Sequence, residues 1–103
     1  MMYTGAHPAE VHISIKQHKV YKGFMVGTVQ AQTITVINNS QEPISVVKNH
    51  VNTNTYYSYG NIPMEVHWVL PRKAVEVTLD QEGNLIVYNC YGAPLRMITH
   101  DYD

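Results

Sequence analysis

An alternation of apolar and polar side chains with a period of two is the feature that most constrains this chain. Residues 75–80 read VEVTLD, and residues 11–16, 33–36 and 64–70 alternate in the same way. Such alternation is typical of a strand with one buried and one exposed face, as in an antiparallel sheet. No stretch long enough for a helix carries the 3.6-residue repeat of an amphipathic helix. The sequence therefore predicts an all-β protein.

Turn-forming residues divide the alternating segments into about seven or eight short strands. Polar turn clusters fill 38–43 and 81–84, and residues 91–94, which read YGAP, form a further predicted turn. The cluster at 81–84 lies between two strand-like segments and predicts a hairpin, in which Gly83 is able to take a positive φ. The predicted strands are 11–16, 20–30, 33–38, 43–49, 64–70, 74–80, 84–90 and 94–99. This pattern indicates one domain over residues 1–103, folded as a compact antiparallel β-sandwich or barrel-like sandwich.

The alternation also predicts which side chains form the core. In each predicted strand the apolar set is expected to face inward. The predicted core consists of Ile13, Ile15, Phe24, Val26, Ile34, Val36, Val46, Val66, Trp68, Val75, Val77, Leu79, Leu85 and Val87.

Charge is sparse and evenly distributed. The formal net charge is −1 and charged residues make up 15% of the chain, against about 25% in average soluble domains. Proteins that bind duplex nucleic acid usually carry a basic patch, and none is visible, so no duplex partner is expected. Eight tyrosines predict a surface that is partly aromatic and polar and that meets a partner subunit or a ligand, and a homo-oligomer is expected.

From the sequence we expect neither secretion, nor insertion into a membrane, nor a bound cofactor. Cys90 is the single cysteine, so no disulfide within the chain is expected. The segment MMYTGAHPAE has neither a basic nor an apolar run, and no apolar stretch reaches membrane-spanning length. A cytoplasmic protein without a membrane partner and without a cofactor is the expectation.

A segment rich in tyrosine and asparagine is the strongest candidate for a binding site. Residues 52–61 read NTNTYYSYGN, within a stretch (50–63) that lacks alternation. Long connections are often functional, and this composition resembles that of antibody recognition loops. Tyrosine rings could stack on a sugar or base while asparagines bond its polar edge; the segment could also be a structural edge strand. The predicted ligand-binding residues are Asn52, Asn54, Tyr56, Tyr57, Tyr59 and Asn61.

Two further groups of residues could support chemistry. Glu10 and His12, and likewise Glu65 and His67, stand two residues apart, so each pair shares one face of a strand. If the two strands were neighbours, these side chains could bind zinc. A nucleophilic Cys90 would need a histidine base, and its flanking residues match no protease or hydrolase signature.

The leading expectation is a non-enzymatic binding module. It would recognise a polar small molecule (a carbohydrate or a nucleotide-like ligand) or a protein surface through the Tyr/Asn-rich segment, as a homo-oligomer. One alternative is a small virus- or phage-encoded structural or inhibitory interaction protein. A second alternative is a metal-dependent enzyme that uses His12, His67 and Glu65.

Overall fold

A computed structural model describes residues 12–21, 29–51 and 61–100. Every regular element in these ranges is a strand, which confirms the predicted all-β class. Among the described residues there is no helix with the length and apolar character to cross a membrane. The strands are β1 (Ile13–Tyr21), β2 (Val29–Asn38), β3 (Ile44–Val51), β4 (Asn61–Val69), β5 (Ala74–Leu79), β6 (Gly83–Tyr88) and β7 (Pro94–Thr99).

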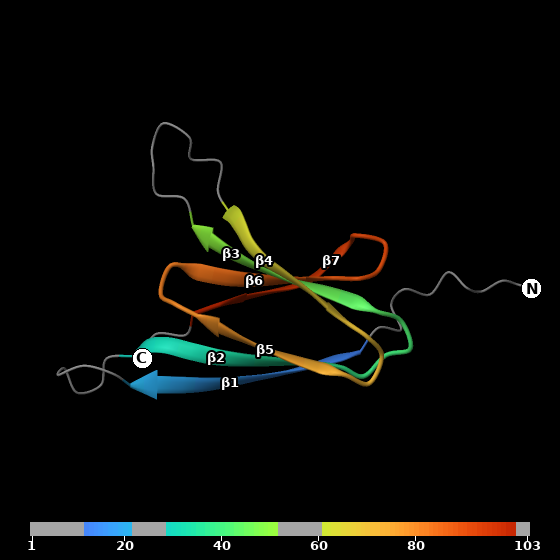
Figure 1. Cartoon of the computed structure of the whole chain (residues 1–103), viewed down its shortest axis with the longest axis horizontal. Helices are drawn as coiled ribbons and strands as arrows, with labels where there is room; N and C mark the ends of the chain where they lie inside the picture. The colour runs from blue at the N-terminus through green and yellow to red at the C-terminus, as the bar shows by residue number, and fades with distance from the viewer. Residues whose placement is uncertain (1–11, 22–28, 52–60, 101–103) are drawn as a thin grey trace, which may run out of the picture.

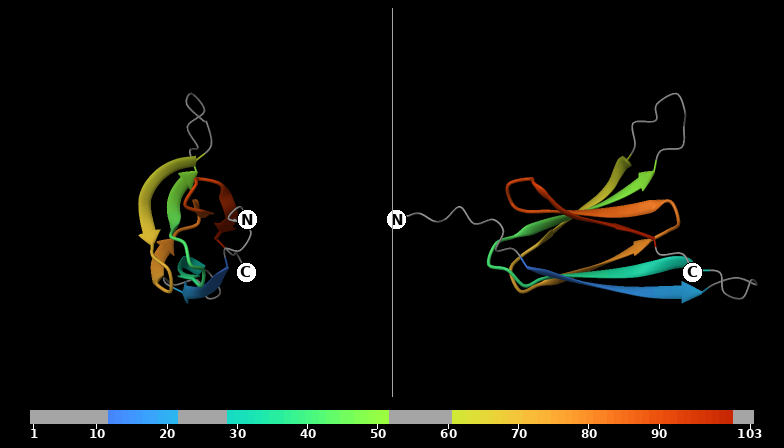
Figure 2. Two further views of the ribbon diagram at one scale, coloured as in Figure 1. Left: turned by 90° about the vertical axis from the view of Figure 1, so that its right-hand side faces the viewer. Right: turned by 180° about the vertical axis from the view of Figure 1, so that it is seen from behind.

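The strands form two antiparallel sheets that face each other, so the predicted sandwich is also confirmed (Figure 1). Sheet A has the order β1-β2-β5, and sheet B has the order β4-β3-β6-β7. Figure 2 shows the two layers end-on and from behind. The pairings are those of strands A, B, E and C, F, G in an immunoglobulin-type sandwich, with β4 on the edge beside β3. Such a fold serves many functions, so the site has to be argued from its own residues.

The core lies between the sheets and is entirely aliphatic. Both sheets contribute, because every strand except β1 supplies at least one buried side chain to it, and Ile13, Ile15 and Val75 pack against its rim. Removing this apolar surface from water is the main term that holds the two sheets together. The buried residues are Ile34, Val36, Ile44, Val46, Val69, Val77, Leu79, Leu85, Val87 and Ile98.

The predicted strand 20–30 was wrong. β1 continues to Tyr21, and β2 begins at Val29 as its antiparallel partner, with Tyr21 opposite Val29. The segment thus contains the end of one strand and the start of the next. Phe24 and Val26, predicted for the core, lie outside the described residues.

The predicted hairpin around Gly83 was also wrong. β5 pairs with β2 in sheet A, and β6 pairs with β3 and β7 in sheet B, so the short connection crosses between sheets. Gly83 does not have a positive φ. Its lack of a side chain matters for a steric reason: a Cβ there would lie 2.8 Å from Leu79 Cδ1 and 3.3 Å from the Asn49 carbonyl oxygen.

The turn predicted after β6 is confirmed. Gly92 has a φ of 85°, a conformation that glycine adopts without a steric penalty. Asn89 closes the turn, because its side-chain Oδ1 accepts hydrogen bonds from the Tyr91 and Ala93 N–H groups, each at 2.9 Å. This turn connects β6 directly to β7 on the edge of sheet B.

Candidate interaction surface

Strand β4 faces the opposite way from the prediction. Val66 and Trp68, predicted for the core, are 57% and 62% exposed, whereas Val69 is buried opposite Ile44. Since side chains alternate along a strand, burial of Val69 turns Val66 and Trp68 outward. Met64 is exposed on the same side as Val66 and Trp68, and Glu65 and His67 alternate with these residues on the other side of the strand.

Asn38 holds the end of β4 in this orientation. The buried Asn38 side chain donates from Nδ2 to the Val69 carbonyl oxygen at 3.0 Å and to the Glu42 carbonyl oxygen at 2.7 Å. Its Oδ1 accepts from the N–H and the hydroxyl of Ser40. One side chain at the end of sheet A therefore fixes both the turn into β3 and the last residue of β4. The turn-rich composition of 38–43 predicted a turn here but not this contact.

The outer face of sheet B carries no charged side chain. We use this name for the side chains that alternate with the core residues of the four strands. β3 contributes small and aliphatic residues, β4 the most exposed apolar residues, β6 a mixed set and β7 a methionine and a threonine. The outer face consists of Ser45, Val47, Asn49, Met64, Val66, Trp68, Asn84, Ile86, Tyr88, Met97 and Thr99.

One row of aliphatic residues crosses all four strands of this face. Val66 lies opposite Val47, Val47 opposite Ile86, and Ile86 opposite Met97. The two residues in the middle strands are half-buried, while Val66 and Met97 on the edges are each 57% exposed. Contiguous exposed apolar surface of this kind usually marks an interaction site.

The neighbouring row is aromatic. Trp68, the only tryptophan, lies opposite Ser45, and Ser45 lies opposite Tyr88. Ser45 is only 7% exposed although it faces outward, because its small side chain sits between two large rings in register. Trp and Tyr are the residues most often enriched at the energetic centre of protein interfaces.

The outer face ends in a pair of buried asparagines. Asn49 and Asn84 face each other across β3 and β6, and Asn49 Nδ2 donates to Asn84 Oδ1 at 3.1 Å. Both side chains are at most 5% exposed. The two amide groups bond to each other within the sheet. This end of the face is therefore polar, but its polar groups are buried.

The inner side of β4 is polar at the open edge of the sandwich. His67 Nε2 lies 2.9 Å from Glu65 Oε1, and Lys48 Nζ lies 3.7 Å from Glu65 Oε2. The hydrogen bond from His67, followed by the charge of Lys48, holds the pKa of Glu65 below its ordinary value. Because the Glu65 carboxylate is half exposed, solvent screens most of this interaction. The positive charge of Lys48 balances the negative charge of Glu65 on this inner side of β4.

The predicted ligand-binding residues fall almost wholly outside the described structure. Only the backbone of Asn61 is described: it begins β4, opposite Val51. The segment 52–60 connects β3 to β4, which are the two strands that form one half of the outer face. The other five predicted residues, Asn52, Asn54, Tyr56, Tyr57 and Tyr59, lie outside the described residues.

The zinc site suggested by the sequence does not assemble from the described residues. Glu65 and His67 do meet, but His12 adjoins β1, which is in sheet A at the edge opposite β5, whereas β4 is in sheet B. Glu10 lies outside the described residues. A different trio could hold a cation: His50, Asp80 and Glu82 each place one ligand atom within 4.8 Å of the other two. Asp80 Oδ1 also accepts the Glu82 N–H at 3.1 Å, as in an ordinary Asx-turn.

Cys90 is placed as a hydrogen-bond donor. Its Sγ lies 3.0 Å from Glu42 Oε1. This hydrogen bond, together with burial and the charge of the Glu42 carboxylate, raises the pKa of the Cys90 thiol. A raised pKa disfavours the thiolate, which is the nucleophilic form.

A groove opens at the edge of the sandwich where β1 and β7 lie. This groove, of about 570 Å³, runs between β1 and β7, and Gln17 Nε2 donates across it to the Thr99 carbonyl oxygen at 3.3 Å. Arg96 and the buried His100 contribute to its lining. The hydrogen bond from Gln17 links the two sheet edges.

Comparison with known proteins gives no functional assignment. No family model matches the chain. No curated protein matches it. Among solved structures, the chain is similar to an X-ray structure of a target of the Northeast Structural Genomics Consortium, with 13% identity over 92% of this chain and 90% of that one. The TM-score of this match is 0.41.

Proposed function

We propose that this chain is a non-enzymatic interaction module that assembles with a protein subunit through the outer face of sheet B. The observation that carries the proposal is the aliphatic row from Val66 to Met97, which crosses four strands without a charge. An antiparallel sheet that faces water on one side normally presents polar residues there. This face does not, so covering it with another protein removes apolar surface from water.

The composition of the face fits a protein partner. The cores of protein interfaces are depleted in charged residues and enriched in aromatic residues and methionine. Trp68, Tyr88, Met64 and Met97 supply those side chains here. Glu65, the charged residue next to Val66 in the sequence, lies on the other side of β4, where it contacts Lys48 and His67.

We also propose that the Tyr/Asn-rich segment takes part in recognition, as the sequence predicts. It leaves β3 after Val51 and enters β4 at Asn61, so it belongs to the same two strands as half of the face. Its tyrosines and asparagines suit contact with a protein surface or with a polar small molecule such as a carbohydrate or nucleotide. We further propose a homo-oligomer in the cytoplasm, a reducing compartment in which a free thiol such as Cys90 is stable.

The experiment compares two lysine substitutions on opposite sides of the sandwich. Val66→Lys places a charge in the aliphatic row, and Thr78→Lys places one on the exposed outer side of sheet A. Untagged wild-type protein purified gently from its own host is expected to carry a bound subunit in native mass spectrometry. Val66→Lys should lose that subunit and Thr78→Lys should keep it.

The fluorescence of Trp68, the only tryptophan, gives an independent readout. In the wild-type complex it should be shielded from acrylamide, and in Val66→Lys it should be quenched freely. A wild-type protein that is a bare monomer with freely quenched Trp68 would contradict the proposal. So would a bound subunit that both variants retain equally.

A further inference from the structure

The four sheet edges differ in how they are protected against pairing with another chain. Edge strands usually carry lysine, proline, bulges or inward-pointing charges that prevent such pairing. β1 carries Lys16 and Lys19, and β7 carries Pro94, Arg96 and a register shift. These two edges are therefore protected.

Edge strand β4 carries Pro63 and a register shift against β3 at Met64, but residues 65–69 have neither of these protections. Glu65 is its one carboxylate there, and its side chain is already in contact with His67. β5 also has a single charge, but its outward side chains are polar or small. Only β4 among the described edges combines a low charge with a row of exposed apolar side chains.

The exposure of the side chains in the aliphatic row indicates that β4 lacks a neighbouring strand on its outer edge. Val47 and Ile86, in the two middle strands, are half-buried because each has a neighbour on both sides. Val66 has a neighbour on one side only and is more than half exposed. One added strand beside β4 would place Val66 in the situation that Val47 already has.

We infer that β4 pairs antiparallel with β4 of a second copy of this chain, about a two-fold axis that passes through Val66. This inference rests on the proposed function and names its partner. The two four-stranded sheets would then join into one continuous sheet, with the two outer faces side by side. A two-fold interface of this kind is self-complementary, since each contact occurs twice.

Charge complementarity selects this register. With the axis at Val66, Glu65 lies opposite the partner's His67, and His67 lies opposite the partner's Glu65. With the axis at Glu65, two carboxylates would face each other, which destabilises a pair of strands. With the axis at His67, two imidazoles would face each other and Glu65 would lie opposite the partner's Val69. A shift by one residue would put inner and outer side chains on the same face and is excluded.

The outer side of the same register is complementary in shape and chemistry. Val66 meets the partner's Val66, and Met64 lies opposite the partner's Trp68, a favourable pairing of sulfur with an aromatic ring. The paired stretch ends where backbone groups of β4 cannot form hydrogen bonds with the partner strand. Pro63 has no N–H group, and the Val69 carbonyl already accepts a hydrogen bond from Asn38.

Single cysteines test the register directly. In a Cys90→Ser background, Val66→Cys places two thiols across the axis, where paired Cα atoms lie about 4.5–5.5 Å apart, within disulfide reach. Met64→Cys is the matched control, because it is equally exposed but would lie about 13 Å from its own copy, four residues along the partner strand. Under mild oxidation we expect Val66→Cys to form a dimer at least tenfold faster than Met64→Cys. A mixture of Met64→Cys and Trp68→Cys should yield the mixed dimer.

Each outcome decides the inference. Cross-linking of Val66→Cys alone, and of the mixed pair, supports the two-fold axis at Val66. Equal cross-linking of Val66→Cys and Met64→Cys, or none in either, overturns it. If cross-linking fails while Val66→Lys still releases a bound subunit, the partner is a different protein and the proposed function stands. If both experiments fail, the proposed function fails too.

Discussion

Strands β4 and β5 follow each other in the chain, and both lie on sheet edges. Both alternate apolar and polar residues, yet β5 buries its alternating apolar residues and β4 exposes them. β5 turns its apolar side chains Val75, Val77 and Leu79 toward the core and its polar ones toward solvent. β4 turns its alternating apolar residues outward and buries only Val69 at its end. The same period of two therefore creates two faces without determining which of them is inside.

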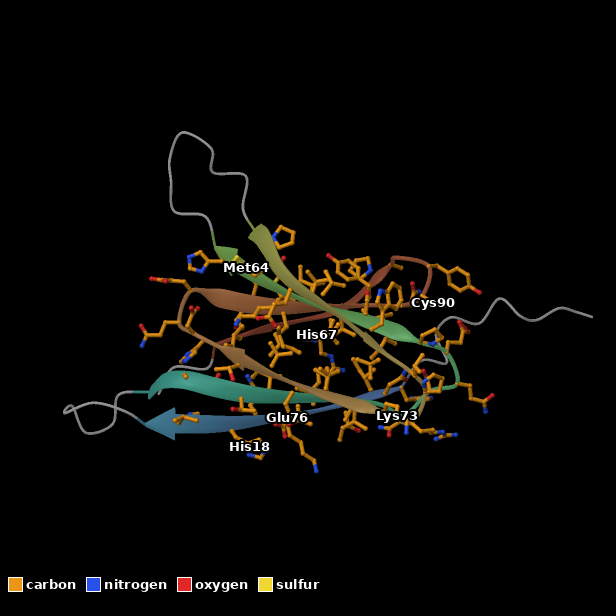
Figure 3. The ribbon with its side chains drawn as sticks, viewed as in Figure 1. His18, Met64, His67, Lys73, Glu76 and Cys90 are labelled. Atoms are coloured by element: carbon orange, nitrogen blue, oxygen red, sulfur yellow. The ribbon has the colours of Figure 1, made fainter. Side chains whose placement is uncertain are left out.

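The consequence is visible on the two outer faces of the sandwich. On sheet A, outward rows such as His18, Thr33 and Thr78 are polar, and Figure 3 shows His18 on that side. Such a face is stable in water without a partner. The outer face of sheet B has no charge and exposes a row of apolar side chains, so it differs from sheet A in the way that the proposed contact with a partner requires.

The largest predicted difference is in the free energy of unfolding, between a substitution in the core and one on the outer face. Leu79→Ala opens space at a fully buried position and should lower the free energy of unfolding by about 2–5 kcal/mol. Trp68→Ala removes a larger side chain, but one that is mostly exposed, and should cost less than about 1 kcal/mol. Urea unfolding of both variants at low protein concentration measures the difference. A Trp68→Ala cost equal to that of Leu79→Ala would mean that β4 faces the core after all.

An intermediate effect should come from the residue that fixes β4. Asn38→Leu keeps the volume but removes the donors to the carbonyl oxygens of Val69 and Glu42. Unsatisfied buried polar groups should make this variant about 2–3 kcal/mol less stable. Asn39→Ala is the control: it loses one exposed bond to Ser14 and should change stability by less than about 0.5 kcal/mol. Equal losses in the two variants would show that Asn38 does not hold β4.

Much of the fold could be predicted from the sequence because it depends on local patterns. Alternation located most of the strands, and Gly92 with Pro94 located the last turn. The core residues of β2, β5 and β6 were also predicted correctly. Pairing across the molecule could not be read this way: 74–90 has the pattern of a hairpin, but its two strands belong to different sheets.

The candidate surface was missed for a related reason. Trp68, Val69 and Leu70 are three consecutive apolar residues, so the alternation breaks down at the end of β4 and allows either face to be buried. The contact of Asn38 with Val69 resolves this ambiguity, and it joins residues 31 positions apart. Break points in an alternating strand are the signal that could have indicated an outward-facing β4.

The smallest effect concerns the polar inner side of β4 and its dependence on pH. Glu65 has a pKa below its ordinary value, chiefly because of the hydrogen bond from His67 and secondly because of Lys48. A lowered pKa in the folded state stabilises the fold above the unfolded-state pKa, and this contribution is lost as the pH falls through the folded-state pKa. We expect His67→Ala to raise the pKa of Glu65, Lys48→Met to raise it less, and Val66→Ala to leave it unchanged, as measured by NMR titration of the carboxyl carbon. A larger rise in Lys48→Met than in His67→Ala would show that charge, and not the hydrogen bond within β4, organises this side of the strand.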